Sequence, residues 1–271
     1  MPSTTVGDVT LSYEEFGRGA LVLFLAGTGS RGRTWRLHQV PALVAAGYRV
    51  LTLDNRGVGD SGPARAGLTV GDLVADTATI IERVVGGPCH IVGASMGALI
   101  TQELALVRPE LVRTASLMAS RARPDALSVA LAQADRDLAD AGIALPATYS
   151  AVTRALQNLS PSTLNDPESA QDWLDILELS PADIMDPGQR AQLDVTLDSD
   201  RRDAYAKISV PTLVLSFADD LIAPPARGRE LAAVIPGAVF HEVAAAGHYG
   251  YLEQPEAVNG ALLDFLKGHL G

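Results

Sequence analysis

The chain has 271 residues, of which 47% are hydrophobic and 20% charged, and its formal net charge is −11. This length and composition predict one globular domain, or one domain with a subdomain, whose core is large enough to fold without crosslinks. The acidic balance argues against nucleic acid and anionic membranes as partners, and the single cysteine, Cys89, excludes an internal disulfide.

The sequence carries no targeting or membrane-spanning pattern. Its first residues contain neither a basic patch nor an apolar stretch, and no run of 18 apolar residues occurs. We therefore expect a soluble, cytoplasmic protein. Metal-ligand spacings, nucleotide motifs and repeats are also missing, so we expect no metal, no cofactor and a small-molecule partner. Association into a homodimer stays open.

The first half of the chain alternates apolar strands with helical patterns. Strands are expected over 9–16, 21–25 and 49–53, before residue 93, and over 114–118, and helices over 35–46, over 70–85 and up to about 108. Thr34 is the expected cap of the helix at 35–46. This alternation predicts a parallel sheet with helices on both faces, whose ligands bind beyond the carboxyl ends of the strands.

A serine follows the fourth apolar run, in the segment Gly93-Ala94-Ser95-Met96-Gly97, and a helical pattern begins at once. A serine wedged into a strand-to-helix turn has a strained backbone, and the flanking glycines remove side chains that would clash. Such a turn presents the serine oxygen beyond the sheet and directs the next backbone N–H groups at the same point. Ser95 is therefore the candidate nucleophile, and a passive serine in a glycine-rich turn is the alternative.

Two other loops follow strands of the predicted sheet. The loop at 26–30 is rich in glycine but lacks the Gly-Lys-Ser/Thr ending of a phosphate-binding P-loop, so its N–H groups are better suited to an oxyanion. The polar loop at 54–62 follows the next strand. We interpret Asp54 and Arg56 there as a structural ion pair that shapes the loop, with catalytic roles as the alternative.

From about Ser120 to Tyr205 the strand pattern gives way to helices. A capping side chain precedes a proline at three places, which is typical of helix starts: Asp166-Pro167, Ser180-Pro181 and Asp186-Pro187. We predict a helical lid subdomain over 120–206, inserted after the sixth strand, and a core formed by 1–119 and 207–271. Trp173, Tyr149 and Leu177 either line a pocket beneath this lid or form its own apolar core.

The strand pattern resumes over 212–217 and 238–243, with helices over 226–235 and 253–269. Asp219 and Asp220 follow the first of these strands, where an acid is well placed to work beside the serine. His248 stands in a small-residue loop after the second strand. The other four histidines fall in predicted helices or strands, so His248 is the candidate base.

Four segments together resemble the α/β-hydrolase superfamily: Gly93–Gly97, Asp54–Ser61, Asp220–Pro224, and Gly247–Tyr249 with Glu253–Glu256 behind it. The chain order of serine, acid and histidine agrees as well. The resemblance spans nearly the whole chain except the insertion and implies a mostly parallel, doubly wound sheet of about eight strands. Within the superfamily, the chain resembles the methylesterase-like and perhydrolase-like enzymes of bacterial secondary metabolism. Where the family usually has His-Gly, this chain has Ala26-Gly27.

The resemblance implies a Ser-His-Asp triad. The family's Asp-x-x-x-Pro spacing selects Asp220 over Asp219 as the acid that orients His248. His248 takes the proton of Ser95 as the hydroxyl attacks a carbonyl carbon, and water later releases the acyl group.

The resemblance also implies an oxyanion hole formed by the backbone N–H groups of Thr28 and Met96. Gly27 and Tyr249 are expected at the substrate site, together with the aromatic and leucine side chains of the lid. The expected reaction is cleavage of a carboxylic ester, or a related acyl bond, of a small and mainly apolar organic compound.

Two other functions stay open at this point. A lyase could use the same residues, with His248 pulling a proton while a carboxylate such as acetate is expelled without an acyl-enzyme. A binding protein could keep the fold without the chemistry.

Overall fold

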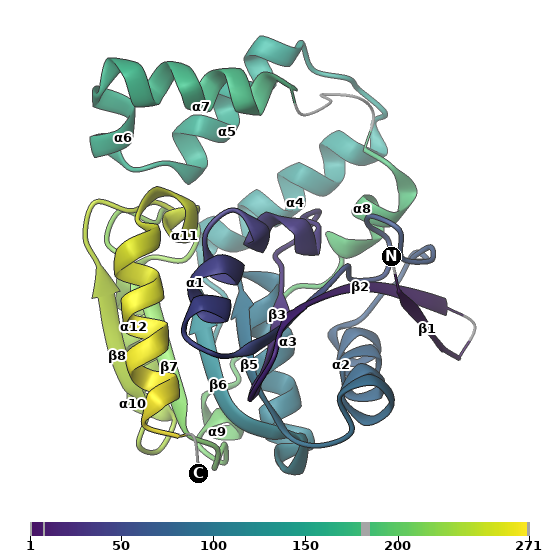
Figure 1. Ribbon diagram of the computed structural model, residues 1–271. Helices are drawn as coiled ribbons and strands as arrows, with labels where there is room; N and C mark the ends of the chain where they lie inside the picture. The colour runs from purple at the N-terminus through teal and green to yellow at the C-terminus, as the bar shows by residue number, and fades with distance from the viewer. Residues whose placement is uncertain (1, 8, 180–184, 270–271) are drawn as a thin grey trace.

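The computed structural model describes residues 2–7, 9–179 and 185–269 (Figure 1). Its strands form one sheet in the order β1-β2-β4-β3-β5-β6-β7-β8, and every pairing from β4 to β8 is parallel. The strands are β1 Ser3–Val6, β2 Val9–Gly17, β3 Leu21–Leu25, β4 Arg49–Leu53, β5 Cys89–Ala94, β6 Val112–Met118, β7 Thr212–Phe217 and β8 Val239–Val243. The prediction of a mostly parallel sheet of about eight strands is confirmed.

Helices cover both faces of this sheet and bury two separate cores. Alternate residues of one strand show the division: Leu23 packs on the face covered by α2, α3 and α10, whereas Phe24 packs on the face covered by α1 and α12. These helices are α1 Gln39–Ala45, α2 Val70–Ile80, α3 Met96–Val107, α10 Pro225–Val234 and α12 Pro255–Lys267. Doubly covered parallel strands explain why the run at 21–25 is apolar throughout and why the run at 49–53 is polar only at Arg49 and Thr52.

Two predicted helices are divided in the structure. The helix expected over 35–46 is a 3₁₀ turn, η1 (Gly32–Arg36), followed by α1, so Thr34 lies inside a helical turn rather than at a cap. Pro41 explains the break, because a proline is tolerated only in the first turn of a helix. The helix expected over 70–85 is α2 followed by a π-helical turn, η2 (Ile81–Val85). The helix expected over 253–269 begins at Pro255, as α12, and a short helix, α11 (Gly250–Glu253), precedes it.

The chain between β6 and β7 is helical, as predicted. It contains α4 Ala126–Asp140, α5 Ala147–Asn158, α6 Pro161–Asn165, α7 Pro167–Leu179, α8 Pro187–Gln192 and α9 Arg202–Tyr205. Asp166 and Asp186 accept hydrogen bonds from backbone N–H groups of the turns that follow them, whereas the helix start predicted at Ser180-Pro181 lies outside the described residues.

Helices α5, α6 and α7 lie together beyond the carboxyl edge of the sheet, farther from it than α4 (Figure 1). At the other end of the segment, Tyr205 is fully buried in the main core. The division of 120–206 from the rest as a lid subdomain stays a prediction. None of the helices in the described ranges has the length and apolarity that crossing a lipid bilayer requires.

The crossing of β5, α3 and β3 leaves no room for side chains at its glycines. A Cβ added to Gly97 would overlap the carbonyl oxygen of Leu25, which is rigid backbone in the central sheet. We therefore expect Gly97→Ala to lower the free energy of unfolding by at least about 3 kcal/mol in urea titrations. Gly260→Ala is the matched control, because this helical glycine has open space around its Cα. Alanine there should raise the free energy of unfolding by about 0.5–1 kcal/mol. Equal stabilities of the two variants would contradict this account.

Candidate active site

Ser95 lies between the last residue of β5 and the first residue of α3, in a strained backbone conformation with φ 53° and ψ −117°. The surrounding packing holds this strain. A Cβ on Gly93 would overlap the carbonyl group of Gly97, so the chain can reverse this sharply only because both positions are glycine. The Ser95 N–H group donates to the carbonyl oxygen of Met118 on the adjacent strand, at 3.0 Å.

Asp220 and His248 form a hydrogen-bonded pair at the ends of β7 and β8. The distance from His248 Nδ1 to Asp220 Oδ2 is 2.8 Å, and Asp220 is only 2% exposed. The other carboxylate oxygen, Oδ1, accepts the backbone N–H groups of Ile222 and Ala223, each at 2.8 Å. The structure thus pairs His248 with Asp220 rather than with Asp219.

The protonation of this pair follows from its surroundings. Burial acts to raise the pKa of Asp220, but the His248 ring and the two backbone N–H donors outweigh it and lower that pKa below its usual range. Asp220 is therefore a carboxylate that can only accept, so Nδ1 of His248 carries the hydrogen. In the neutral imidazole, Nε2 is then free to take a proton.

The loop that carries His248 is held by the helical segment between β6 and β7. The Gly247 N–H group donates to Glu253 Oε2 at 2.7 Å, and Glu253 Oε1 accepts from the Ser160 N–H group at 2.8 Å. The Tyr249 N–H group donates to the carbonyl oxygen of Asn158 at 3.0 Å. The position of His248 therefore depends on the junction between α5 and α6.

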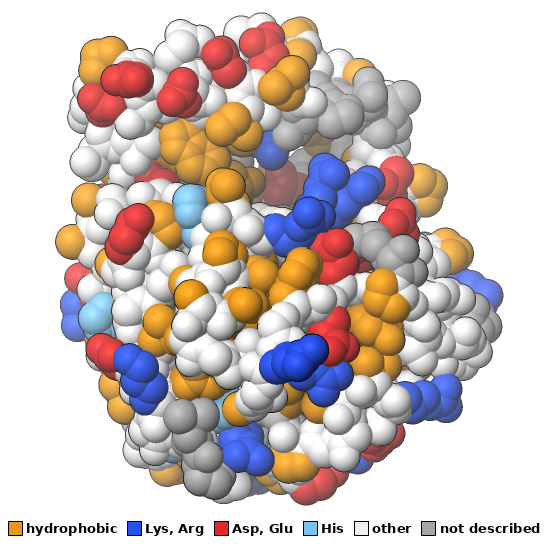
Figure 2. All heavy atoms as spheres, in the orientation of Figure 1, with side chains coloured by type: hydrophobic (Ala, Val, Ile, Leu, Met, Phe, Trp, Pro, Cys, Tyr) orange, Lys and Arg blue, Asp and Glu red, His pale blue; other side chains and the backbone are white. Residues whose placement is uncertain are grey.

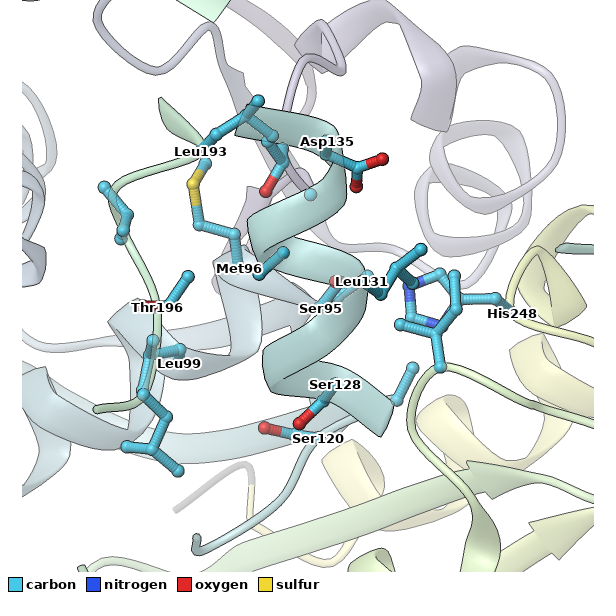
Figure 3. Close-up of a pocket in the computed structure, with 18 of the residues that line it drawn as sticks. Ser95, Met96, Leu99, Ser120, Ser128, Leu131, Asp135, Leu193, Thr196 and His248 are labelled. Atoms are coloured by element: carbon cyan, nitrogen blue, oxygen red, sulfur yellow. The ribbon is translucent and has the colours of Figure 1, made fainter. Parts of the chain in front are cut away.

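Ser95 and His248 line one cavity of about 510 Å³. Gly27, Thr28, Met96 and Tyr249, all predicted site residues, line it as well. Helix α4 forms one wall, and Ser128, Leu131 and Asp135 on it are shown with Ser95 and His248 in Figure 3. Figure 2 shows a hollow below the helices at the top of the view, with basic and acidic side chains around it.

Three of the predicted substrate contacts are not brought to this cavity. Trp173 and Leu177 pack in a small cluster with residues of α5, because the apolar faces of α5 and α7 cover each other. Tyr149 is 60% exposed. Of the two readings left open by the sequence, the structure places Trp173 and Leu177 in the core of the helical segment. Trp173 still stacks on Tyr249, with 6.2 Å between ring centroids.

The walls contain residues that sequence reasoning missed. They come from α4, from the last residue of α8 and from the segment after it: Ser128, Leu131, Asp135, Arg136, Gln192, Leu193, Val195 and Leu197. Positions 128, 131 and 135 follow a helical period, but nothing local in the sequence distinguishes a cavity-facing stripe from any other face of a helix. The segment at 193–197 shows no periodic pattern at all.

The loop after β3 offers backbone donors beside the serine. A Cβ added to Gly27 would lie 3.9 Å from Ser95 Oγ, so this loop approaches the serine closely. Within the described ranges, the Thr28 N–H group makes no hydrogen bond, and the Met96 N–H group belongs to the first turn of α3, where helical partners are missing. Both N–H groups are therefore free to bind an oxyanion.

The loop at 54–62 supports the loop after β3, but the predicted ion pair is wrong. Arg56 forms its ion pair with Asp76 of α2. Burial raises the pKa of the Asp76 carboxyl group, although the arginine beside it acts in the opposite direction. Asp54 instead accepts the Gly32 N–H group at 2.7 Å. Asn55 donates to the carbonyl oxygen of Ala26, at 3.3 Å.

Ala26, where the family usually has histidine, is fully buried in the core. Its carbonyl group is held from the 54–62 loop, so the loop after β3 keeps its course without a histidine side chain. The described residues contain no group of three or more His, Cys, Asp or Glu side chains that could hold a metal ion.

The fold and the sequence are similar to those of several known proteins. A Mycobacterium tuberculosis protein with the provisional name non-heme bromoperoxidase BpoC is 46% identical over 257 residues, which cover 95% of this chain and 97% of that protein. Its crystal structure matches with a TM-score of 0.91, covering 95% of this chain and 96% of that chain. An Azorhizobium caulinodans protein with the provisional name carbamate hydrolase RutD is 30% identical over 270 residues, covering 98% of both chains.

A more distant structure has the same architecture. The crystal structure of an enol-lactonase from Burkholderia xenovorans LB400 is 25% identical, with a TM-score of 0.81, and the match covers 98% of this chain and 100% of that chain. The sequence model of the alpha/beta hydrolase family matches residues 22–261. With this match across most of the chain, and with a relative 46% identical over nearly its full length, the chain belongs to the alpha/beta hydrolase family.

Proposed function

We propose that this protein is a serine hydrolase that cleaves a carboxylic ester or related acyl bond of a small, mainly apolar organic compound. One observation carries the proposal. The strained Ser95 and the Asp220-bound His248 face the same cavity, beside two backbone N–H groups that have no hydrogen-bond partner among the residues the structure describes. These are the parts that nucleophilic acyl transfer requires.

The proposed steps follow from these positions. His248 Nε2 accepts the proton of Ser95 Oγ while that oxygen bonds to the acyl carbon. The N–H groups of Thr28 and Met96 stabilise the tetrahedral oxyanion, and the protonated His248, stabilised by Asp220, gives its proton to the leaving alcohol. Water then attacks the acyl-enzyme, with His248 again accepting the proton, and the carboxylic acid is released.

The cavity supports the substrate class. The cavity wall is mixed: α3 and α4 contribute the apolar side chains Met96, Leu99, Val129, Leu131 and Ala132, and the charged side chains of the wall are Arg121, Asp135, Arg136 and Asp198. Arg121 pairs with Asp125 and donates to the carbonyl oxygen of Ile222. A compound with an apolar body and one or two polar groups fits such a site. The names of two relatives, a carbamate hydrolase and an enol-lactonase, also describe acyl-bond cleavage.

A second candidate function comes from the name of the 46% identical relative, a non-heme bromoperoxidase. Hydrogen peroxide in place of water would attack the same acyl-enzyme, break the bond to Ser95 Oγ and leave as a peroxyacid. The peroxyacid would oxidise bromide in solution to hypobromous acid and be reduced to the carboxylic acid. This route needs no metal and uses the same residues as hydrolysis.

The first prediction concerns the nucleophile. Ser95→Ala should abolish hydrolysis of short p-nitrophenyl esters and leave the thermal unfolding midpoint within a few degrees, because only one oxygen is removed. Mass spectrometry after a fluorophosphonate probe should show one adduct on the wild type and none on the variant. Retained turnover in Ser95→Ala would contradict an acyl-enzyme on Ser95 and would instead support direct attack of water on the ester, with His248 as the general base.

The second prediction concerns the acid. In Asp220→Asn, the amide oxygen should still accept hydrogen bonds from the N–H groups of Ile222 and Ala223, so the NH₂ group would face His248 Nδ1. Nδ1 would then have to accept, which places the imidazole hydrogen on Nε2, where the base needs a free lone pair. We expect kcat to fall about 10³- to 10⁴-fold. Asp219→Asn is the matched control and should keep kcat within about twofold. A comparable loss in both variants would argue against this assignment of the acid.

The third prediction separates water from peroxide as acceptor. With acetate, hydrogen peroxide and bromide at mildly acidic pH, the wild type should brominate a dye if peroxide intercepts the acyl-enzyme, and Ser95→Ala should not. Ester hydrolysis without bromination would leave hydrolysis as the function. Bromination that survives in Ser95→Ala would show that the acyl-enzyme is not its source.

A further inference from the structure

Gln192 connects the helical segment between β6 and β7 to the loop that carries the proposed oxyanion donor. It is the last residue of α8, its side chain is 1% exposed, and it lines the cavity that contains Ser95. The beginning of α8 also lies against the 54–62 loop, since a Cβ on Gly188 would overlap the backbone of Gly57.

Both ends of the Gln192 amide are used. Oε1 accepts the Gly29 N–H group at 2.8 Å, and Nε2 donates to the carbonyl oxygen of Arg56 at 2.8 Å. One partner is a donor and the other an acceptor, so the amide has a single orientation that satisfies both. The side chain thereby bridges the loops that follow β3 and β4.

The Gly29 N–H group belongs to a tight turn. The Ser30 N–H group donates to the carbonyl oxygen of Gly27 at 3.1 Å, which places Thr28 and Gly29 at the two central positions. Gly29 has φ +69°, a conformation that favours glycine at the third position of such a turn. The turn is thus held at Gly29 by Gln192 and closed by Ser30, while the Thr28 N–H group has no hydrogen-bond partner in the described part of the chain.

We propose that Gln192 is a positioning residue, which holds the turn at 27–30 so that the Thr28 N–H group is aimed at the oxyanion. The inference rests on the proposed function. Without this bond, the Gly29 N–H group has no partner at the cavity wall, and the turn is free to rotate away from Ser95.

The effect should fall on the transition state rather than on substrate binding. The oxyanion develops only during the reaction, and the loss of one such donor typically lowers kcat about 10²- to 10³-fold. A misaimed donor keeps part of its strength, so a smaller loss, about tenfold or more, is expected with KM nearly unchanged. A change that acted only through stability would not divide in this way between kcat and KM.

The experiment compares Gln192→Met, Gln192→Ala and the wild type. Methionine has nearly the shape of glutamine without its hydrogen bonds, so Gln192→Met separates hydrogen bonding from packing. The rates are measured with p-nitrophenyl butyrate, and affinity with a trifluoromethyl ketone, which forms an oxyanion adduct on the serine. Asn259→Ala is the control. The amide of Asn259, on α12, also donates to a backbone carbonyl group, that of His38 just before α1, but Asn259 does not line the cavity.

Both Gln192 variants should lower kcat about tenfold or more and lower the affinity for the trifluoromethyl ketone by a similar factor, while KM stays within about twofold of the wild-type value. The pH dependence of kcat/KM should not move, because the His248–Asp220 pair is untouched, and Asn259→Ala should match the wild type in all three measurements. Wild-type kcat and ketone affinity in Gln192→Met would overturn the inference, as would a change confined to KM.

Failure of this inference differs from failure of the proposed function. If Ser95→Ala is inactive while Gln192→Met is fully active, the serine mechanism stands and the role of Gln192 is wrong. If the wild type neither hydrolyses the ester nor binds the ketone, the proposed function itself is wrong.

Discussion

The close crossing of β3, β5 and α3 is the constraint on which the rest of the site depends. Gly93 and Gly97 let backbone approach backbone, and the packing that results holds Ser95 in a conformation that few non-glycine residues adopt. A serine on a relaxed turn would lie lower, within the edge of the sheet. The strain therefore has a structural origin, in the central core, and a consequence at the cavity, where the hydroxyl is exposed.

The other functional groups reach this point because parallel strands end at one edge. The loops after β3, β5, β7 and β8 bring together Thr28, Ser95, Asp220 and His248, which span more than 200 residues of the sequence. The carboxylate of Asp220 is buried against the His248 ring, and that ring together with two backbone N–H groups keeps the carboxylate charged.

The helical segment between β6 and β7 contacts both halves of this arrangement. Near α5 and α6 it holds the His248 loop through Asn158 and Glu253, and at the end of α8 it holds the loop after β3 through Gln192. Its apolar cluster packs between α5 and α7, while α4 and the stretch after α8 line part of the cavity. Variation in this segment would change the shape of the cavity and the position of the catalytic loops together.

The sequence by itself determined the sheet apart from β1, the strand ends and the residues at them, because doubly buried strands are mostly apolar and the turns beyond them need particular residues. Ser95 and His248 were selected in this way, and Asp220 through the spacing typical of the family. Only the tertiary structure decided what packs on what. It paired Arg56 with Asp76, packed Trp173 against a helical cluster and placed Gln192 beside Gly29. Such contacts join positions 20 to more than 160 residues apart, and a local pattern shows that a side chain will be buried or bonded, but not which distant group will meet it.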